Sequence, residues 1–237
     1  LDDVSFTANS GEILGIAGIS GCGQKELLEA IAGLQTVESG SICYIEDDGS
    51  REELIGKDPL SIAELGVSLS FVPEDRLGMG LVGNMNLADM MLRSFRRGKS
   101  IFTDRRSPRA LAESVVQELS VSTPSVDTPV RRLSGGNVQK VLVGREIASA
   151  PTVLLTAYAV RGLDIHSSYT IYDLINRQKK AGVAVIFVGE DLDVLLELCD
   201  RILVLCGGKV SGIVSGRGAE KREVGMMMTK LGGQSHE

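Results

Sequence analysis

The chain has 237 residues, of which 43% are hydrophobic, 24% charged and 4% aromatic, and its formal net charge is −6. This length predicts one large domain whose core needs no disulfide or metal for stability, and this composition excludes a disordered chain. The negative charge and the scarcity of aromatic side chains argue against a nucleic-acid-binding surface, so we expect no nucleic-acid partner.

The first third of the chain predicts strands, a glycine-rich loop and one helix. In chain order these are a half-exposed strand (1–8), a turn (9–11), an apolar strand (12–17), a glycine-rich loop (18–23), an amphipathic helix (25–32) and two further strands (41–45 and 69–72). A strand, a glycine-rich loop and a helix in this order are typical of a phosphate-binding site.

The composition changes between about residues 77 and 130, where methionines and a helix at 108–119 indicate an inserted helical subdomain. The elements expected after it are helices at 136–148, 167–180 and 192–198, strands at 152–156 and 183–188, and a hairpin formed by 202–206 and 209–214. Short apolar strands that alternate with helices predict a mainly parallel sheet covered on both faces.

The glycine-rich loop begins at Gly18 and has the spacing of a phosphate loop, in which backbone N–H groups surround an anion at the start of a helix. Such a loop ends in Lys followed by Ser or Thr, whereas this one ends in Gln24 and Lys25. Lys25 stands where a Mg²⁺-binding hydroxyl is expected, and an ammonium cannot ligate a cation. A plain glycine-rich turn is the alternative interpretation of this stretch taken alone.

A second motif, Leu133-Ser134-Gly135-Gly136-Asn137, is followed by an apolar strand and then by Arg161-Gly162-Leu163-Asp164. Phosphate loop, LSGG, apolar strand and GLD in this order resemble the ATP-binding domain of ABC transporters. The stretch 71–76 (FVPEDR), LSGGN in place of LSGGQ, and Glu190-Asp191-Leu192 look like the second, degenerate half of the tandem ATPase subunit of simple-sugar or nucleoside importers.

This resemblance implies an α/β fold, a P-loop NTPase (RecA-like) core with a mainly parallel sheet, an antiparallel β edge and an inserted ABC α-helical subdomain. We expect residues 1–76 and 134–231 to form the α/β core and residues 77–133 the helical subdomain. Because the chain opens at Leu1 inside a strand-like pattern, we also expect it to be part of a longer tandem chain.

The resemblance also indicates what the chain's own ATP site lacks. The positions that hold the family's Mg²⁺-binding Asp and catalytic Glu are Ala157 and Tyr158, the Q-loop position is Glu74, and the switch-histidine position is Glu190. The residues expected to contact nucleotide are Gly18, Ser20, Gly21, Cys22, Gly23, Gln24, Lys25 and Glu26. No catalytic residue is intact, so we expect weak ATP binding, doubtful Mg²⁺ binding, no metal site and little or no hydrolysis.

The groups that act on a partner domain's ATP are, by the same resemblance, intact. Ser134, Gly135, Gly136 and Asn137 form the signature that would complete the partner's site, and Asp164 is the D-loop residue. Glycines there let the backbone approach a γ-phosphate at the positive end of a helix.

The partners implied are a second ABC ATP-binding domain, transmembrane permease subunits and, indirectly, an extracellular solute-binding protein. The chain would lie on the cytoplasmic face of the plasma (inner) membrane. Its four cysteines include no CxxC pair and fit a cytosolic protein with reduced thiols. Two alternatives remain: a regulatory nucleotide-binding module without a transport role, and a soluble ABC-type ATPase acting on nucleic acid. The sequence does not name the transported solute.

Overall fold

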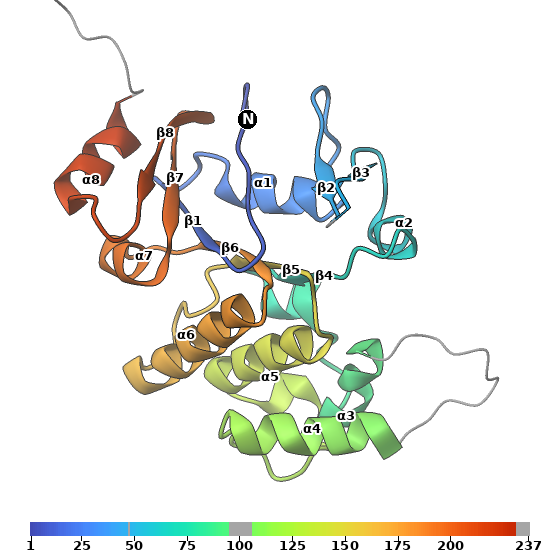
Figure 1. Cartoon of the computed structure of the whole chain (residues 1–237). Coiled ribbons are helices and arrows are strands. Elements are labelled where there is room, and N and C mark those ends of the chain that lie inside the picture. Colours follow the sequence, from blue (N-terminus) through green and yellow to red (C-terminus); the bar gives the residue numbers. More distant parts are fainter. Residues whose placement is uncertain (47, 95–105, 231–237) are drawn as a thin grey trace, which may run out of the picture.

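The structure, a computed structural model, describes residues 1–46, 48–94 and 106–230. Its main sheet has six strands in the order β4-β5-β6-β1-β7-β8 (Figure 1). Their bounds are β1 (Ile13–Gly18), β4 (Leu69–Val72), β5 (Val153–Ala157), β6 (Ala184–Val188), β7 (Arg201–Cys206) and β8 (Lys209–Ser215). All neighbouring pairs are parallel except β7 and β8, which form an antiparallel edge. The predicted fold class is confirmed.

Helices cover both faces of this sheet, which explains why its central strands are apolar on both sides. On β1, Ile13 and Ala17 belong to one core cluster, whereas Leu14 and Ile16 belong to another. The second cluster includes residues of α1 (Gln24–Ile31), and the first includes residues of α5 (Gly135–Ala148) and α6 (Ile165–Lys180). Figure 1 shows α1 on one side of the sheet and α5 and α6 on the other.

Between β4 and β5 the chain is largely helical. The elements there, besides α5, are η1 (Arg76–Gly80), α3 (Leu87–Met90), η2 (Met91–Ser94), α4 (Arg106–Glu118) and η3 (Val130–Arg132). Met90 and Met91 are buried in the core cluster that α5 shares. The division into a core (1–76 and 134–231) and a helical subdomain (77–133) stays a prediction, and residue 231 lies outside the described residues.

Several elements differ from expectation. Residues 1–8 form no strand; Val4, Phe6 and Ala8 are partly buried as their alternation predicts, but a strand also needs a hydrogen-bonded neighbour. Outside the predicted helical subdomain, the elements that the sequence did not predict are β3 (Arg51–Glu53), α2 (Pro59–Glu64) and α8 (Lys221–Thr229). β3 pairs with β2 (Cys43–Ile45) in a separate small sheet, and α7 (Leu192–Leu198) has its predicted bounds. Within the described part of the chain, every helix is too short or too polar to cross a membrane.

Candidate functional site

The glycine-rich loop joins β1 to α1, and two of its glycines, Gly21 (φ 84°) and Gly23 (φ 101°), adopt left-handed backbone conformations. Gln24 begins α1 and is only 3% exposed. Its Nε2 donates a hydrogen bond to the carbonyl oxygen of Ile19, 3.1 Å away, and would lie 2.6 Å from a Cβ placed on Gly18. The Gln24 amide therefore packs against the loop, where it satisfies a loop carbonyl.

Lys25 does not enter the loop. Its side chain is 49% exposed, and its Nζ lies 3.7 Å from Oε1 of Glu29, one turn further along α1. Of the other predicted nucleotide contacts, Ser20, Gly21 and Glu26 are exposed and Cys22 is half-buried. The lysine that follows Gln24 is therefore paired with the buried carboxylate of Glu29 and is not directed into the loop.

Three adjacent parallel strands end at the same edge of the sheet, and this edge collects the other predicted residues of the chain's own site. Glu74 follows β4, Tyr158 follows β5 and Glu190 follows β6. Ala157, the last residue of β5, is 1% exposed and offers only a methyl group.

Arg161 lies between the two carboxylates. Its Nη1 pairs with Oε1 of Glu74, and its Nε lies 3.1 Å from Oε1 of Glu190. One guanidinium therefore pairs with both acidic groups. In the residues that the structure describes, no three His, Cys, Asp or Glu side chains are grouped as a metal site. An apolar Ala157 and two carboxylates held by an arginine do not fit Mg²⁺ bound by the chain's own side chains.

Tyr158 occupies the centre of this arrangement with a left-handed backbone (φ 54°) and donates its N–H to the carbonyl of Val188 at 3.0 Å. The guanidinium of Arg161 lies 5.7 Å from its ring centroid. Burial, followed by the nearby carboxylates of Glu74 and Glu190, raises the pKa of Tyr158 above its ordinary value of 10.0. The phenol stays protonated at neutral pH and cannot act there as a general base.

The LSGGN motif begins α5 and is on the surface. Ser134 is the N-cap residue, and its Oγ accepts a hydrogen bond from Nδ2 of Asn137 at 2.9 Å. Oδ1 of Asn137 in turn accepts the N–H of Ser122 at 2.9 Å. Ser134 and Gly135 are exposed. Asn137 thus fixes the cap, and the start of the helix faces solvent. The phosphate loop precedes α1 and this motif begins α5, and these two helices lie on opposite faces of the sheet (Figure 1).

Asp164 is the N-cap residue of α6. Its Oδ1 accepts the N–H of Ser167 at 2.9 Å, and its Oδ2 accepts the hydroxyl of Ser167 at 2.6 Å. These two hydrogen bonds lower the pKa of the Asp164 carboxyl. Capping its own helix is therefore one function of this residue, and a contact across a dimer stays a prediction.

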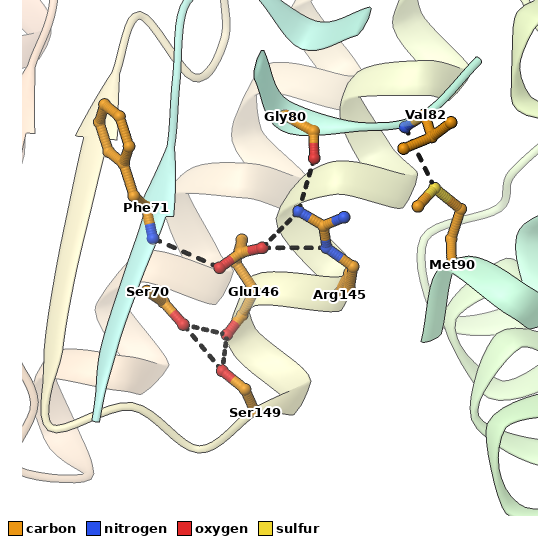
Figure 2. Close-up of polar contacts among 8 residues, drawn as sticks. All are labelled: Ser70, Phe71, Gly80, Val82, Met90, Arg145, Glu146 and Ser149. Carbon is orange, nitrogen blue, oxygen red and sulfur yellow. Dashed lines mark hydrogen bonds and ion pairs between the residues drawn. The ribbon is translucent and has the colours of Figure 1, made fainter. Parts of the chain in front are cut away.

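A buried ion pair secures the far end of α5 (Figure 2). Oε1 of Glu146 accepts hydrogen bonds from Nε and Nη2 of Arg145 at 2.9 and 2.6 Å, and Oε2 accepts the N–H of Phe71 on β4 at 3.3 Å. Arg145 Nη2 also donates to the carbonyl of Gly80 at 2.7 Å. These contacts tie α5 to the sheet and to the end of η1.

Two arginines have positions in the site that sequence reasoning did not assign. Arg76 and Arg161 belong to the stretches that carry the family resemblance, but no role was predicted for either. One signal was present: two carboxylates, Glu74 and Glu190, stand where the family has a neutral Gln and a His, which calls for a nearby cation.

Comparison with known families identifies the family of the chain. The family model described as ABC transporter matches residues 1–156, which is more than half of the chain. The chain belongs to the ABC transporter family. Solved structures share its fold: a dimeric ATP-binding cassette in a post-hydrolysis state, bound to ADP and Pi, has a TM-score of 0.75 at 21% identity over 91% of this chain and 90% of that one.

Curated relatives are more similar in sequence. A glucose import ATP-binding protein of Haloferax volcanii is 37% identical over 97% of this chain and 42% of its own length. A ribose import ATP-binding protein of Rubrobacter xylanophilus is 34% identical, and a guanosine import ATP-binding protein of Bacillus subtilis 33%. These cover 94% and 95% of this chain, and in each case 44% of the relative. The chain spans less than half the length of the curated relatives it matches.

Proposed function

We propose that this chain is an ATP-binding domain of an ABC importer for a sugar or a nucleoside, in which its signature serves a partner's ATP. The relatives' names, which include glucose, ribose and guanosine import, support this class of solute. One observation carries the assignment of roles. The two carboxylates at the chain's own site, Glu74 and Glu190, are paired with Arg161, whereas Ser134 and Gly135 are exposed at the start of a 14-residue helix.

The chain's own site binds nucleotide weakly in this proposal. Loop amides between Gly18 and Gly23 can still hold phosphate oxygens. Gln24 contributes a neutral amide where the family has a cation, and the family's Mg²⁺ ligands are missing. Phosphoryl transfer depends on positioning and charge neutralisation, so this site performs little or no hydrolysis.

The signature has the opposite character. The hydroxyl of Ser134 and the amides of Gly135 and Gly136 are donors at the positive end of α5, where a γ-phosphate of ATP held by a partner domain is stabilised. Asn137 orients the Ser134 hydroxyl through the 2.9 Å hydrogen bond between them. Asp164 would approach the same partner from the start of α6.

The partners that follow are a second ABC ATP-binding domain, permease subunits and an extracellular solute-binding protein that acts through the permease. The chain would be peripheral, on the cytoplasmic face of the plasma (inner) membrane. The helical region 77–133 is the proposed contact with the permease, and residues 1–76 and 134–231 are the proposed core.

The test compares two substitutions in the assembled importer, with both ATP-binding domains and the permease present. Gly135→Asp places a carboxylate against the proposed γ-phosphate, and we expect it to remove about 2–4 kcal/mol of transition-state stabilisation, or 10²–10³ in ATP turnover and uptake. Gln24→Ala changes a residue of the chain's own site, which does no chemistry in this proposal, and should lower ATP turnover and uptake far less.

A Cβ at Gly135 would lie 3.3 Å from Nη1 of Arg76, so an aspartate there could pair with that arginine. Gly135→Asn is the matched control, because it has the same shape without the charge. Equal, mild effects of Gly135→Asp and Gln24→Ala on turnover and uptake would show that the signature does not serve a partner's ATP.

A further inference from the structure

One guanidinium connects the two segments that are proposed to face the partner domain. Nη1 of Arg76 donates to the carbonyl of Gly135 at 3.1 Å, and Nη2 of the same side chain donates to the carbonyl of Arg161. The first carbonyl belongs to the signature segment (Ser134–Asn137), and the second to the D-turn (Arg161–Asp164). These segments are far apart in sequence and are joined here by a single side chain.

The two segments also fit closely around Arg76 and each other. A Cβ at Gly135 would lie 3.3 Å from Nη1 of Arg76, and one at Gly162 would lie 4.0 Å from Nη2. A Cβ at Gly136 would lie 3.4 Å from Cδ2 of Leu163. The lack of a side chain at Gly135 therefore lets the guanidinium approach that backbone closely, whereas a Cβ at Gly136 or Gly162 would make an ordinary van der Waals contact.

The supports of Arg76 are themselves fixed. Its own turn, η1, is capped by Asp75, whose Oδ1 accepts the N–H of Gly78 at 2.8 Å. The carbonyl of Gly80, at the other end of η1, accepts a hydrogen bond from Arg145 of α5 at 2.7 Å. η1 is therefore hydrogen-bonded to α5 near both ends of α5, at Gly135 and at Arg145. On the D-turn side, Glu74 and Glu190 hold the side chain of Arg161.

We propose that Arg76 is a positioning residue that holds the signature segment and the D-turn at a fixed spacing, so that both reach the partner domain as one rigid unit. This rests on the proposed function, in which both segments face a partner. An arginine suits this role because its planar fork presents two donors in fixed geometry, whereas a lysine presents one nitrogen on a flexible stem.

The first experiment measures amide hydrogen exchange in the 237-residue chain. The reporters are Val138, whose N–H donates to Ser134 at 2.9 Å, and Leu163, whose N–H donates to Val160 at 3.1 Å. In Arg76→Ala we expect exchange at both amides to accelerate about tenfold or more, because in each segment a carbonyl, that of Gly135 or of Arg161, loses the hydrogen bond that the guanidinium donates to it. In Arg76→Lys we expect protection from exchange to return at only one of the two reporter amides, because the single lysine nitrogen holds one segment and not both.

Arg109→Ala is the matched control, because it removes an arginine whose described ion pairs, with Asp127 at 2.8 Å and with Glu113 at 3.4 Å, involve neither segment. It should leave both reporters unchanged. Unchanged exchange in Arg76→Ala, acceleration spread over the whole chain, or full recovery of both segments in Arg76→Lys would each overturn the positioning role.

The second experiment uses the assembled importer. Misalignment of the signature should lower kcat about tenfold to a hundredfold in Arg76→Ala while KM for ATP stays near the wild-type value. A raised KM with unchanged kcat would contradict the proposal. The two ideas fail separately: if Gly135→Asp is mild, the trans-acting signature is wrong whatever Arg76 does. If Gly135→Asp abolishes turnover and Arg76→Ala exchanges like wild type, only the role of Arg76 is wrong.

Discussion

The buried ion pair on α5 gives the largest effect on stability that we expect from one substitution outside the apolar core. The side chains of Glu146 and Arg145 are 1% and 5% exposed, and Glu146 accepts from Arg145 and from the N–H of Phe71 (Figure 2). In Glu146→Ala the guanidinium loses its carboxylate and the backbone of β4 loses an acceptor. Removing one member of a buried pair costs about 3–5 kcal/mol of the free energy of unfolding.

For a chain of this size, each kcal/mol lowers Tm by about 2–4 °C, so Glu146→Ala should lower Tm by about 6–20 °C. The assay is thermal unfolding of the 237-residue chain followed by circular dichroism, with a reversibility check. Glu146→Gln keeps the volume and one acceptor oxygen, so its Tm should fall between those of Glu146→Ala and the wild type.

The control is Arg109→Ala, which breaks a pair whose side chains are 47% and 57% exposed. Exposed pairs contribute at most about 1 kcal/mol, so its Tm should change by less than about 4 °C. If Glu146→Ala and Arg109→Ala have the same Tm, the buried pair does not anchor α5 to β4, and the reasoning from burial is wrong.

Two further predictions concern the chain's own site. The 237-residue chain should hydrolyse ATP no faster than a buffer blank. The single substitution Tyr158→Glu should restore almost no ATP hydrolysis, because catalytic groups act together. Steady ATP turnover that is lost on mutating Gly23 would contradict this prediction. Nucleotide binding by the wild-type chain, measured by calorimetry, should be weak and unchanged by EDTA. In Arg161→Ala the affinity should depend on Mg²⁺, because the substitution releases the carboxylates of Glu74 and Glu190. A wild-type affinity that collapses with EDTA would refute this prediction.

Apolar periodicity predicted most of the fold, because burial against the sheet determines the pattern of the strands and helices that touch it. Leu69–Val72 and Leu192–Leu198 have their predicted bounds for this reason. α2 and β3 were missed because they are short and mostly polar or exposed. For α2 a local signal existed: Asp58 followed by Pro59 is a typical N-cap and first helical residue, and Asp58 Oδ1 accepts the N–H of Ser61 at 2.8 Å.

The motifs indicated which residues belong to the site but not which of them touch. Arg161 pairs with Glu74 because β4, β5 and β6 are adjacent and parallel, so the residues that follow them meet at one edge. The strand order depends on long-range packing that no local pattern contains. The hydrogen bond of Arg76 to Gly135 also requires η1 to lie along α5, which only the folded chain shows.

The ion pairs of Arg161 and of Glu146 therefore have different consequences. The side chain of Arg161 is 53% exposed, so its pairs with Glu74 and Glu190 contribute little to the free energy of unfolding. These pairs instead engage two carboxylates at the edge of the sheet where the family binds metal. They also hold Arg161 at the start of the D-turn, and the carbonyl of Arg161 accepts the hydrogen bond from Arg76. The pair of Glu146, by contrast, contributes to the fold itself. Substitutions at Arg161 should thus change the Mg²⁺ dependence of nucleotide binding with little change in Tm. Substitutions at Glu146 should lower Tm with little change in the Mg²⁺ dependence of nucleotide binding.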